Sequence, residues 1–357
     1  MIILHLIPTL SGGGAERQLC YLASKLEDLG NEIHICYLNE GIEKPNLKGI
    51  ILHPIKTRSN YSPYILWQLI LIVRKTKPDI IHTWITQMDI LGGILAFFFK
   101  IPTVIREPTS SLYYTNNWKN KLRISLGAKA KIIVSNSLGG DEYWKQRLPS
   151  SKRAIVRNGL PIEMIEKIGA SLPIGLSNLT DPFVLYVGRL IESKSLNILL
   201  SAVALVKKKQ DIKLVLCGVG NQKDELQELA ERLNIVKDIY FAGYLMSEEI
   251  FALMKKASVF ISLSDYEGCP NTVIEAMACG CPIIVSKIAA HLEILDDTTA
   301  LFVENKDVNR IAEAMEDIFN NQEEANKRVN IAKNRTKEWS ISEMAKKYES
   351  IYRSILN

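Results

Sequence analysis

The chain has 357 residues, enough for about two domains with full hydrophobic cores. Apolar residues make up 47% of it and charged residues 23%, which excludes a low-complexity disordered chain, a collagen and a coiled coil. The formal net charge is +5, but residues 1–158 hold 21 Lys and Arg against 11 Asp and Glu, whereas the remainder holds 23 against 28, so the two halves are expected to meet different partners.

In the first half, short apolar runs alternate with longer helical patterns. Strands are predicted at Ile2–Ile7, Glu32–Leu38, Gly49–Ile55, Asp79–Thr83, Thr103–Ile105, Lys131–Ser135 and Arg153–Arg157. Helices are predicted at Ala15–Leu29, Ser62–Lys75 and Gln87–Lys100. Such alternation is typical of parallel sheets that carry helices on both faces.

A glycine run, Gly12 to Gly14, lies between the first strand and the first helix. Glycines let a backbone approach a ligand closely, and a helix N-terminus favours anions, so the run is a candidate phosphate contact. The dinucleotide fingerprint G-x-G-x-x-G is not met, because Arg17 occupies its sixth position. A tight turn without a ligand is the alternative.

The stretch Tyr113–Arg153 combines nine Lys and Arg with two acidic residues and with the aromatic side chains of Tyr113, Tyr114, Trp118, Tyr143 and Trp144. Basic and aromatic residues together suit an anionic membrane surface. Nucleic acid would suit them too, but no nucleic-acid motif accompanies them, so no such partner is expected. A solvated basic face, or chance variation of surface charge, is the alternative.

Between Asn158 and Pro182 the strand pattern is lost and Gly and Pro accumulate, which indicates a domain boundary. Strands follow at Phe183–Val187, Lys213–Cys217, Asp238–Phe241, Val259–Leu263, Pro282–Val285 and Ala300–Val303, and helices at Ser195–Lys208, Lys223–Leu233, Ser247–Lys256, Thr272–Cys279 and Val308–Asn320. We therefore predict two doubly wound α/β domains, residues 1–160 and 175–339, with an amphipathic helix at 340–357 packing back on the first. In such folds ligands bind at the carboxyl ends of the strands, and here in a cleft between the domains.

Arg189 and Lys194 follow the first strand of the second half, on a loop at a strand exit. Arg presents a planar fork to phosphate oxygens, and Lys presents a point charge. Two cations at this place suit a diphosphate, although solvated surface charges would show the same pattern.

Glu267 and Glu275 flank the start of the helix that follows strand Val259–Leu263. The free amides at such a helix N-terminus can hold phosphate. Carboxylates repel phosphate but accept hydrogen bonds from sugar hydroxyls. The alternative is that both carboxylates only complement the helix dipole. This alternative is disfavoured because Arg189 and Lys194 are expected at the same sheet edge.

Together these motifs resemble the retaining glycosyltransferases of family 4, which have the two-domain GT-B fold. The resemblance extends over essentially the whole chain. It includes Gly-Gly-Gly-Ala-Glu-Arg at 12–17, Val-Arg-Asn-Gly at 156–159, Val-Gly-Arg-Leu to Lys at 187–194, Gly-Val-Gly at 218–220, Phe-Ala-Gly-Tyr at 241–244 and the glutamates at 267 and 275. It implies two Rossmann-like domains facing across a cleft, and a nucleotide diphosphate sugar donor, with UDP as the expected carrier.

By this resemblance, Glu267 touches the donor sugar, Glu275 touches the ribose, and Arg189 and Lys194 hold the diphosphate. Further substrate contacts are implied for Gly13, Gly14, Gly218, Tyr244, Leu245, Gly268, Asn271 and Thr272. The chain departs from many relatives at Arg106 and Glu107, where those relatives carry a His. Arg106 and Glu107 are kept as candidate substrate contacts, and His82 is a further candidate.

The expected reaction is the transfer of a hexose to a hydroxyl with retention, by a front-face route, with Arg189, Lys194 and Glu267 as the catalytic residues. The expected acceptor is a lipid-linked saccharide in bacterial surface polysaccharide assembly. No metal or cofactor is expected, because no spaced Asp pair stands in a suitable loop. A sugar-nucleotide epimerase and a non-catalytic nucleotide-sugar-binding subunit are the alternatives, and a nicotinamide dehydrogenase is disfavoured by Arg17.

The six cysteines show no CxxC pair and lie mostly in apolar runs, so we expect buried thiols in a reducing compartment. Neither a signal peptide nor a membrane-spanning segment is predicted. The expected location is the cytoplasm, peripherally on the inner face of the cytoplasmic membrane.

Overall fold

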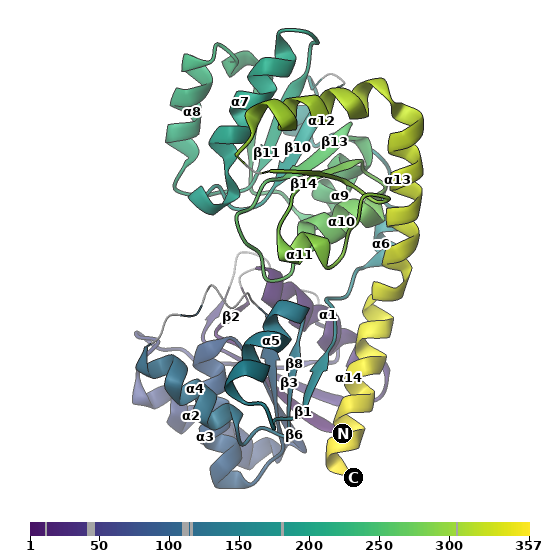
Figure 1. Ribbon diagram of the computed structural model, residues 1–357. Coiled ribbons are helices and arrows are strands. Elements are labelled where there is room, and N and C mark those ends of the chain that lie inside the picture. Colours follow the sequence, from purple (N-terminus) through teal and green to yellow (C-terminus); the bar gives the residue numbers. More distant parts are fainter. Residues whose placement is uncertain (11–12, 41–46, 109–113, 115–116, 180–181, 305) are drawn as a thin grey trace. The chain divides into compact units, whose positions relative to one another are not determined.

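The structure is a computed structural model that describes the chain except residues 11–12, 41–46, 109–113, 115–116, 180–181 and 305. The chain forms two compact units (Figure 1). The first comprises Met1–Gly159 together with Trp339–Asn357, and the second comprises Leu160–Glu338. The second unit thus begins before residue 175, because helix α6 (Ile162–Lys167) packs against α10 (Asn271–Cys279) of that unit.

The first unit is built on a seven-stranded parallel sheet. Its strand order is β5 (Ile51–Pro54), β3 (Glu32–Tyr37), β1 (Ile2–Leu6), β6 (Ile80–Trp84), β7 (Thr103–Glu107), β8 (Ile132–Ser135) and β9 (Arg153–Ile155). A second, small sheet pairs β2 (Thr9–Leu10) with β4 (Asn39–Glu40). The central strands β6 and β7 are buried along their whole length, as expected for a parallel sheet covered on both faces.

Helices cover both faces of this sheet. Helices α1 (Gly14–Asp28) and α14 (Ile341–Leu356) close the apolar core on one face, and α2 (Pro63–Thr76) and α3 (Thr86–Phe99) close the core on the other. Two shorter helices, α4 (Trp118–Gly127) and α5 (Leu138–Arg147), were not predicted.

The C-terminal helix α14 is tied to the sheet of the first unit by buried hydrogen bonds. Arg106 on β7 donates to Tyr348 Oη at 2.5 Å and to the carbonyl oxygen of Val156 at 2.8 Å. Tyr352 Oη lies 2.7 Å from His82 Nδ1 on β6. Because these partners are fully buried, α14 is part of the core of the first unit.

Gly159 is enclosed between α1 and α14. The Gln18 side chain donates through Nε2 to the Gly159 carbonyl at 2.9 Å and accepts the Gly159 N–H through Oε1 at 2.7 Å. A Cβ at Gly159 would lie 2.9 Å from Cα of Ile341, so only a glycine allows α14 to start this close to it. The points where the chain leaves the first unit and returns to it therefore adjoin.

The second unit contains a six-stranded parallel sheet. Its order is β12 (Ile239–Gly243), β11 (Lys213–Cys217), β10 (Phe183–Val187), β13 (Val259–Ser262), β14 (Ile283–Ser286) and β15 (Leu301–Val303). Its helices are α6 and α10, already named, with α7 (Leu196–Lys207), α8 (Lys223–Arg232), α9 (Ser247–Lys256), α11 (Ala289–Leu292), α12 (Val308–Asn320) and α13 (Gln322–Arg335). The two parallel α/β sheets confirm the predicted fold class.

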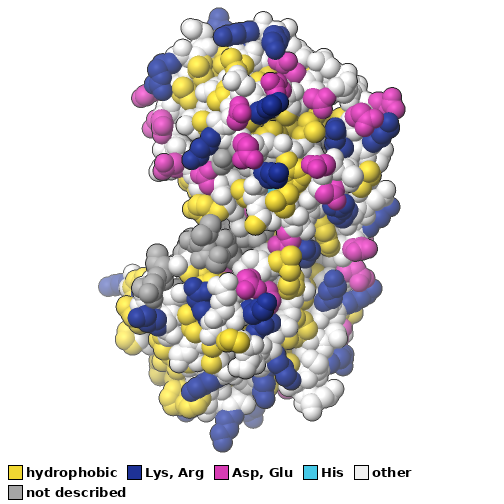
Figure 2. Space-filling view, in the orientation of Figure 1, with side chains coloured by type: hydrophobic (Ala, Val, Ile, Leu, Met, Phe, Trp, Pro, Cys, Tyr) yellow, Lys and Arg dark blue, Asp and Glu magenta, His cyan; other side chains and the backbone are white. Residues whose placement is uncertain are grey.

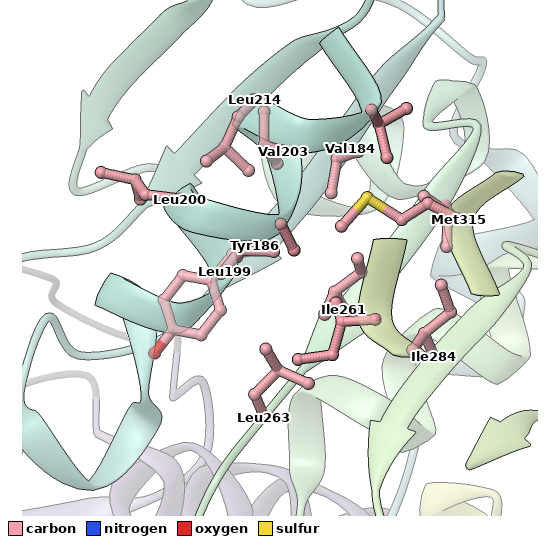
Figure 3. Close-up of a cluster of buried hydrophobic side chains, with 14 of the residues drawn as sticks. Val184, Tyr186, Leu199, Leu200, Val203, Leu214, Ile261, Leu263, Ile284 and Met315 are labelled. Atoms are coloured by element: carbon pink, nitrogen blue, oxygen red, sulfur yellow. The ribbon is translucent and has the colours of Figure 1, made fainter. Parts of the chain in front are cut away.

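The main core of the second unit lies between its sheet and helices α7 and α12. Val184 and Ile261 on neighbouring strands face Val203 on α7 and Met315 on α12 (Figure 3). Apolar side chains of adjacent parallel strands thus fix the sheet order, which decides which strand-exit loops become neighbours.

Candidate active site

Lys194, Ser264 and Glu267 form a polar cluster at the carboxyl ends of two neighbouring strands. Lys194 ends the short 3-10 turn Glu192–Lys194 after β10, and the other two residues follow β13. Lys194 Nζ forms an ion pair with Glu267 Oε1 and lies 3.3 Å from Ser264 Oγ. Ser264 Oγ donates to Glu267 Oε1 at 2.8 Å, so the carboxylate is held by two donors. The structure thus joins two predicted site residues that are far apart in the sequence.

A second layer of hydrogen bonds supports this cluster from β14. Ser286 Oγ donates to the carbonyl oxygen of Ser264 at 2.7 Å, and His291 Nδ1 lies 2.8 Å from the carbonyl oxygen of Ser286. Burial lowers the pKa of His291, which keeps its ring neutral at pH 7. Ser264, Ser286 and His291 were not predicted, because an isolated Ser or His after a strand carries no spacing signal.

Arg189 is exposed on the loop that follows β10. Tyr186 Oη donates to the carbonyl oxygen of Arg189 at 2.8 Å and so fixes the backbone of the loop. Burial, together with the charge of Glu267, raises the pKa of Tyr186, so the phenol stays protonated as a donor. The guanidinium of Arg189 is therefore carried by a loop whose backbone is held by a hydrogen bond.

The loops after β10 and β11 pack backbone against backbone. Gly188 N–H donates to the carbonyl oxygen of Cys217, and Gly218 N–H donates to that of Gly243. A Cβ at Gly218 would overlap the Gly188 carbonyl, which explains why glycine is required there. Beyond β12, Tyr244 is exposed and Leu245 is half-buried, so both are available at this sheet edge.

Glu275 lies inside α10 and is buried, whereas Gly268, Asn271 and Thr272 at the start of α10 are partly exposed. Helix α10 begins at Asn271 after Pro270, so its N-terminus, the positive end of the helix dipole, directly follows the loop that carries Glu267. The arrangement combines a cation-held carboxylate, an exposed guanidinium and a helix N-terminus at one sheet edge. These groups can bind a sugar and stabilise a developing phosphate charge.

In the first unit, the described part of the glycine run begins at Gly13, since Gly12 lies outside the described residues. Gly13 is the N-cap of α1 and is exposed, and Gly14 is the first residue of that helix. The run therefore ends at the N-terminus of a helix of 15 residues, as its spacing predicts.

Arg106 and Glu107 are buried and bound to their own unit. Besides its bonds to Tyr348 and Val156, Arg106 donates to Asn158 Oδ1 at 2.5 Å. Glu107 accepts hydrogen bonds from Tyr114 Oη at 2.7 Å and from Trp144 Nε1 at 2.9 Å. These contacts give both residues structural partners within the first unit, and a contact of either residue with substrate stays a prediction.

Arg123 belongs to the stretch Tyr113–Arg153, which was expected to face an anionic membrane, but its side chain is fully buried. It donates from Nε to Asp89 at 2.7 Å and from Nη2 to Glu107 at 2.9 Å, between the rings of Tyr114 and Trp144. It cannot face a membrane, so the basic and aromatic stretch is split between core and surface. Tyr113 of that stretch lies outside the described residues.

No three His, Cys, Asp or Glu side chains among the described residues gather in a way that could hold a metal ion. None of the helices in the described ranges is both long and apolar enough to cross a membrane.

Two family profiles match the chain. That of the family described as "Glycosyltransferase Family 4" matches residues 12–163, and that of "Glycosyl transferases group 1" matches residues 170–337. Between them they cover most of both units.

Two curated relatives match over most of their length. The chain is 29% identical to the N-acetylgalactosamine-N,N'-diacetylbacillosaminyl-diphospho-undecaprenol 4-alpha-N-acetylgalactosaminyltransferase of Campylobacter jejuni, over 95% of this chain and 96% of that protein. It is 24% identical to the capsular polysaccharide biosynthesis glycosyltransferase CapH of Staphylococcus aureus, over 82% and 83%.

Solved structures share the fold. HepE of Anabaena, solved in complex with UDP and glucose, superposes with a TM-score of 0.83 at 19% identity, over 99% of this chain and all of the other. Sucrose-phosphate synthase of Thermosynechococcus elongatus gives a TM-score of 0.82 at 18% identity, over 99% of both chains.

Proposed function

The chain belongs to the glycosyltransferases of family 4 and has the GT-B fold, and on that basis we propose that it transfers a hexose from a nucleotide diphosphate sugar to a lipid-linked saccharide. The observation that carries this proposal is the Lys194–Glu267 pair, with Arg189 exposed at the same sheet edge. The carboxylate suits the sugar hydroxyls, and the cations suit the diphosphate.

We place the donor on the second unit. In this proposal Arg189 and Lys194 face the diphosphate, Glu267 the sugar and Glu275 the ribose. Gly218, Tyr244, Leu245, Gly268, Asn271 and Thr272 line the donor, and Gly13 and Gly14 approach it from the first unit. UDP as the carrier is supported by HepE, which was solved in complex with UDP.

The proposed reaction retains the configuration of the sugar. The bond between the anomeric carbon and the phosphate oxygen breaks, and the acceptor oxygen bonds to that carbon on the same face. The acceptor proton passes to the departing phosphate oxygen. Arg189, Lys194 and the amides of α10 stabilise the negative charge that develops on the nucleotide diphosphate.

The acceptor and the location follow from the relatives and from surface charge. The Campylobacter enzyme is named for a diphospho-undecaprenol-linked sugar, and CapH for capsular polysaccharide. An acceptor of that kind lies at a membrane, which fits a chain whose residues 1–158 carry a net excess of basic side chains. We therefore place the protein peripherally on the inner face of the cytoplasmic membrane.

A donor screen followed by product analysis tests the proposal. Nucleotide sugars are first screened for thermal stabilisation, since a ligand at 100 times its Kd adds about 2.7 kcal/mol of stability. The stabilising donor is then incubated with and without a lipid-linked acceptor. Transfer with retained anomeric configuration supports the proposal. A changed donor sugar without acceptor indicates an epimerase, and donor binding without turnover indicates a non-catalytic subunit.

A further inference from the structure

A pocket of about 530 Å³ lies in the first unit where α3 ends and strand β7 begins. Its apolar wall is formed mainly by Phe97, Phe98, Ile101, Ile105 and Leu126. Thr103, the first residue of β7, also lines it. The pocket is therefore at the amino ends of the strands, opposite to the carboxyl ends where substrates are expected.

The mouth of this pocket exposes aromatic side chains to solvent. Phe97 is 58% exposed and Phe98 is 74% exposed, although both are large and apolar. The base of the pocket is closed by the near contact of α3 and α4, because a Cβ at Gly93 would lie 2.9 Å from Cβ of Leu126. A hollow with an apolar base and exposed rings is suited to a hydrocarbon chain.

Three lysines border the pocket, and none of the described residues that line it is acidic. Lys100, Lys129 and Lys131 are all exposed, and none forms an ion pair within the described residues. Lys129 Nζ lies 4.0 Å from the centre of the Phe97 ring. Lys100 ends α3 in the left-handed conformation (φ 57°), which is uncommon for a residue other than Gly or Asn. The charge at the pocket thus complements an anionic headgroup.

Helix α2, which contacts α3, carries an exposed apolar stripe of its own. Tyr64, Trp67 and Leu71 are spaced three and four residues apart on one side of α2, and all are exposed. Figure 2 shows apolar side chains mixed with Lys and Arg along the flank where Figure 1 places α2, α3 and α4. Such a flank is typical of a protein that lies on a bilayer.

We propose that the pocket bordered by Lys100, Lys129 and Lys131 binds one anionic phospholipid of the bilayer, with its chain between Phe97, Phe98 and Leu126. The lysines contact the phosphate while their stems cover the rings. This lipid is an anchor and not a substrate, because the pocket lies at the amino ends of the strands of the first unit, whereas substrates of such sheets bind at the carboxyl ends. The inference deepens the membrane part of the proposed function and rests on it.

Titration of the intact chain with monomeric dioctanoyl phosphatidylglycerol, followed by calorimetry, measures this binding directly. Replacing the pocket lysines in Lys100→Gln/Lys129→Gln/Lys131→Gln should weaken it about fivefold for each charge removed. The matched control Lys119→Gln/Lys121→Gln/Lys152→Gln removes the same amount of charge from the first unit outside the pocket, and it should bind almost as the wild type does. Ala96→Phe fills the pocket, keeps every lysine and should weaken binding by roughly tenfold.

Sedimentation with vesicles gives a second measurement. Vesicles of equal parts phosphatidylcholine and phosphatidylglycerol should bind the wild type more tightly than pure phosphatidylcholine vesicles do. Phe98→Ser should weaken binding to the mixed vesicles both in low and in high salt. Thermal unfolding checks that each variant is folded. An equal loss of phosphatidylglycerol affinity in both triple lysine variants would overturn the proposed lipid site and indicate diffuse electrostatic attraction instead. Unchanged affinity in Ala96→Phe, or equal affinity for both headgroups, would overturn it in favour of another occupant, such as a protein partner. The assay contains no nucleotide sugar, so its result is independent of whether the chain transfers sugar.

Discussion

Lys194 has two roles, and replacing it removes both of them at once. It carries positive charge at a strand exit, and it holds Glu267 in place with Ser264. Arg189 has the first task without the second, since it is exposed and its loop is held through the backbone by Tyr186. The two cations are therefore expected to differ in what their loss does to the fold.

We expect Arg189→Ala and Lys194→Ala each to lower kcat by about 10²–10³, because each removes a donor from the departing diphosphate. Steady-state kinetics with the identified donor provides the measurement. Arg189→Ala should keep the wild-type Tm, whereas Lys194→Ala should lower it, since Glu267 loses its cation. Wild-type rates in both folded variants would refute the diphosphate assignment.

The two glutamates are expected to separate binding from turnover. Glu275 is buried within α10 near the proposed ribose, so Glu275→Ala should weaken the binding of free nucleotide diphosphate. Glu267→Gln keeps the size of the side chain and removes its charge, so it should mainly lower kcat and leave nucleotide binding nearly normal. Calorimetry with the nucleotide diphosphate tests both, and the reverse pattern would contradict the assigned roles.

Activity is expected to survive EDTA. Arg189 and Lys194 are fixed cations at the place where the leaving group gathers charge, and they can perform the electrostatic task that a metal performs in other transferases. The measurement is the transfer rate before and after chelation. Complete loss of activity that added Mg²⁺ or Mn²⁺ restores would disprove this expectation.

At the residue scale, the sequence indicated the charged groups of the site but not their supporting partners. Lys194 and Glu267 stand in recognisable motifs. Ser286 and His291 became neighbours of that pair only because β14 lies beside β13, and β13 beside β10. A strand order of this kind is set by packing over long sequence distances, so single-residue patterns do not reveal it.

At the scale of elements, α4 shows why the basic stretch was misread in part. Arg123 on this helix is buried against Asp89 and Glu107, while Lys121 is exposed and Lys119 is partly exposed. Composition counts all three as positive charge and does not distinguish a buried face from a solvated one. Burial follows from the partners, and those lie on β7 and α3.

Removing the charge of Arg123 and removing the charge of Lys121, both on α4, should therefore have very different effects on stability. Arg123→Ala leaves two buried carboxylates without their cation, which typically costs about 3–5 kcal/mol. Lys121→Ala on the same helix should change the free energy of unfolding by no more than about 0.5 kcal/mol. Urea unfolding of both variants makes the comparison. Similar stabilities would mean that the buried network is not what fixes α4.

The helices that were not predicted share a weak apolar pattern. Helix α13 buries only Ala325 and Ala332 among its described residues, and α5 places Tyr143 and Trp144 in the core from an otherwise polar segment. Sequence periodicity detects helices with a continuous apolar stripe, such as α12. Most strands were placed within about two residues, because buried parallel strands are short apolar runs.

At the scale of the whole molecule, buried histidines link stability to pH. Burial lowers the pKa of His5 to about 3 and also lowers the pKa values of His82 and His291. Their folded pKa values lie below the unfolded value of about 6.5, so the unfolded chain binds protons more readily. The free energy of unfolding therefore keeps its full value above about pH 6.5 and decreases as the pH falls below about 6.5.

We expect the free energy of unfolding to drop steeply between about pH 6.5 and about pH 5, by up to roughly 1.4 kcal/mol per pH unit for each buried His. Urea unfolding across this range measures the slope. His53 is half-buried on the surface of β5, so His53→Gln should change the slope far less than His291→Gln does. A flat profile would show that these rings are not neutral in the folded chain.

The enclosure of Gly159 between Gln18 and Ile341 has a consequence for how the protein folds during its synthesis on the ribosome. The first unit takes Met344, Tyr348 and Tyr352 into its core, yet these residues are synthesised after the whole of the second unit. The second unit is one uninterrupted segment and can fold as soon as it has emerged. The first unit therefore cannot complete its core until α14 has been synthesised. Until then, the apolar surface that α14 covers in the folded protein is exposed, and a chaperone can bind there.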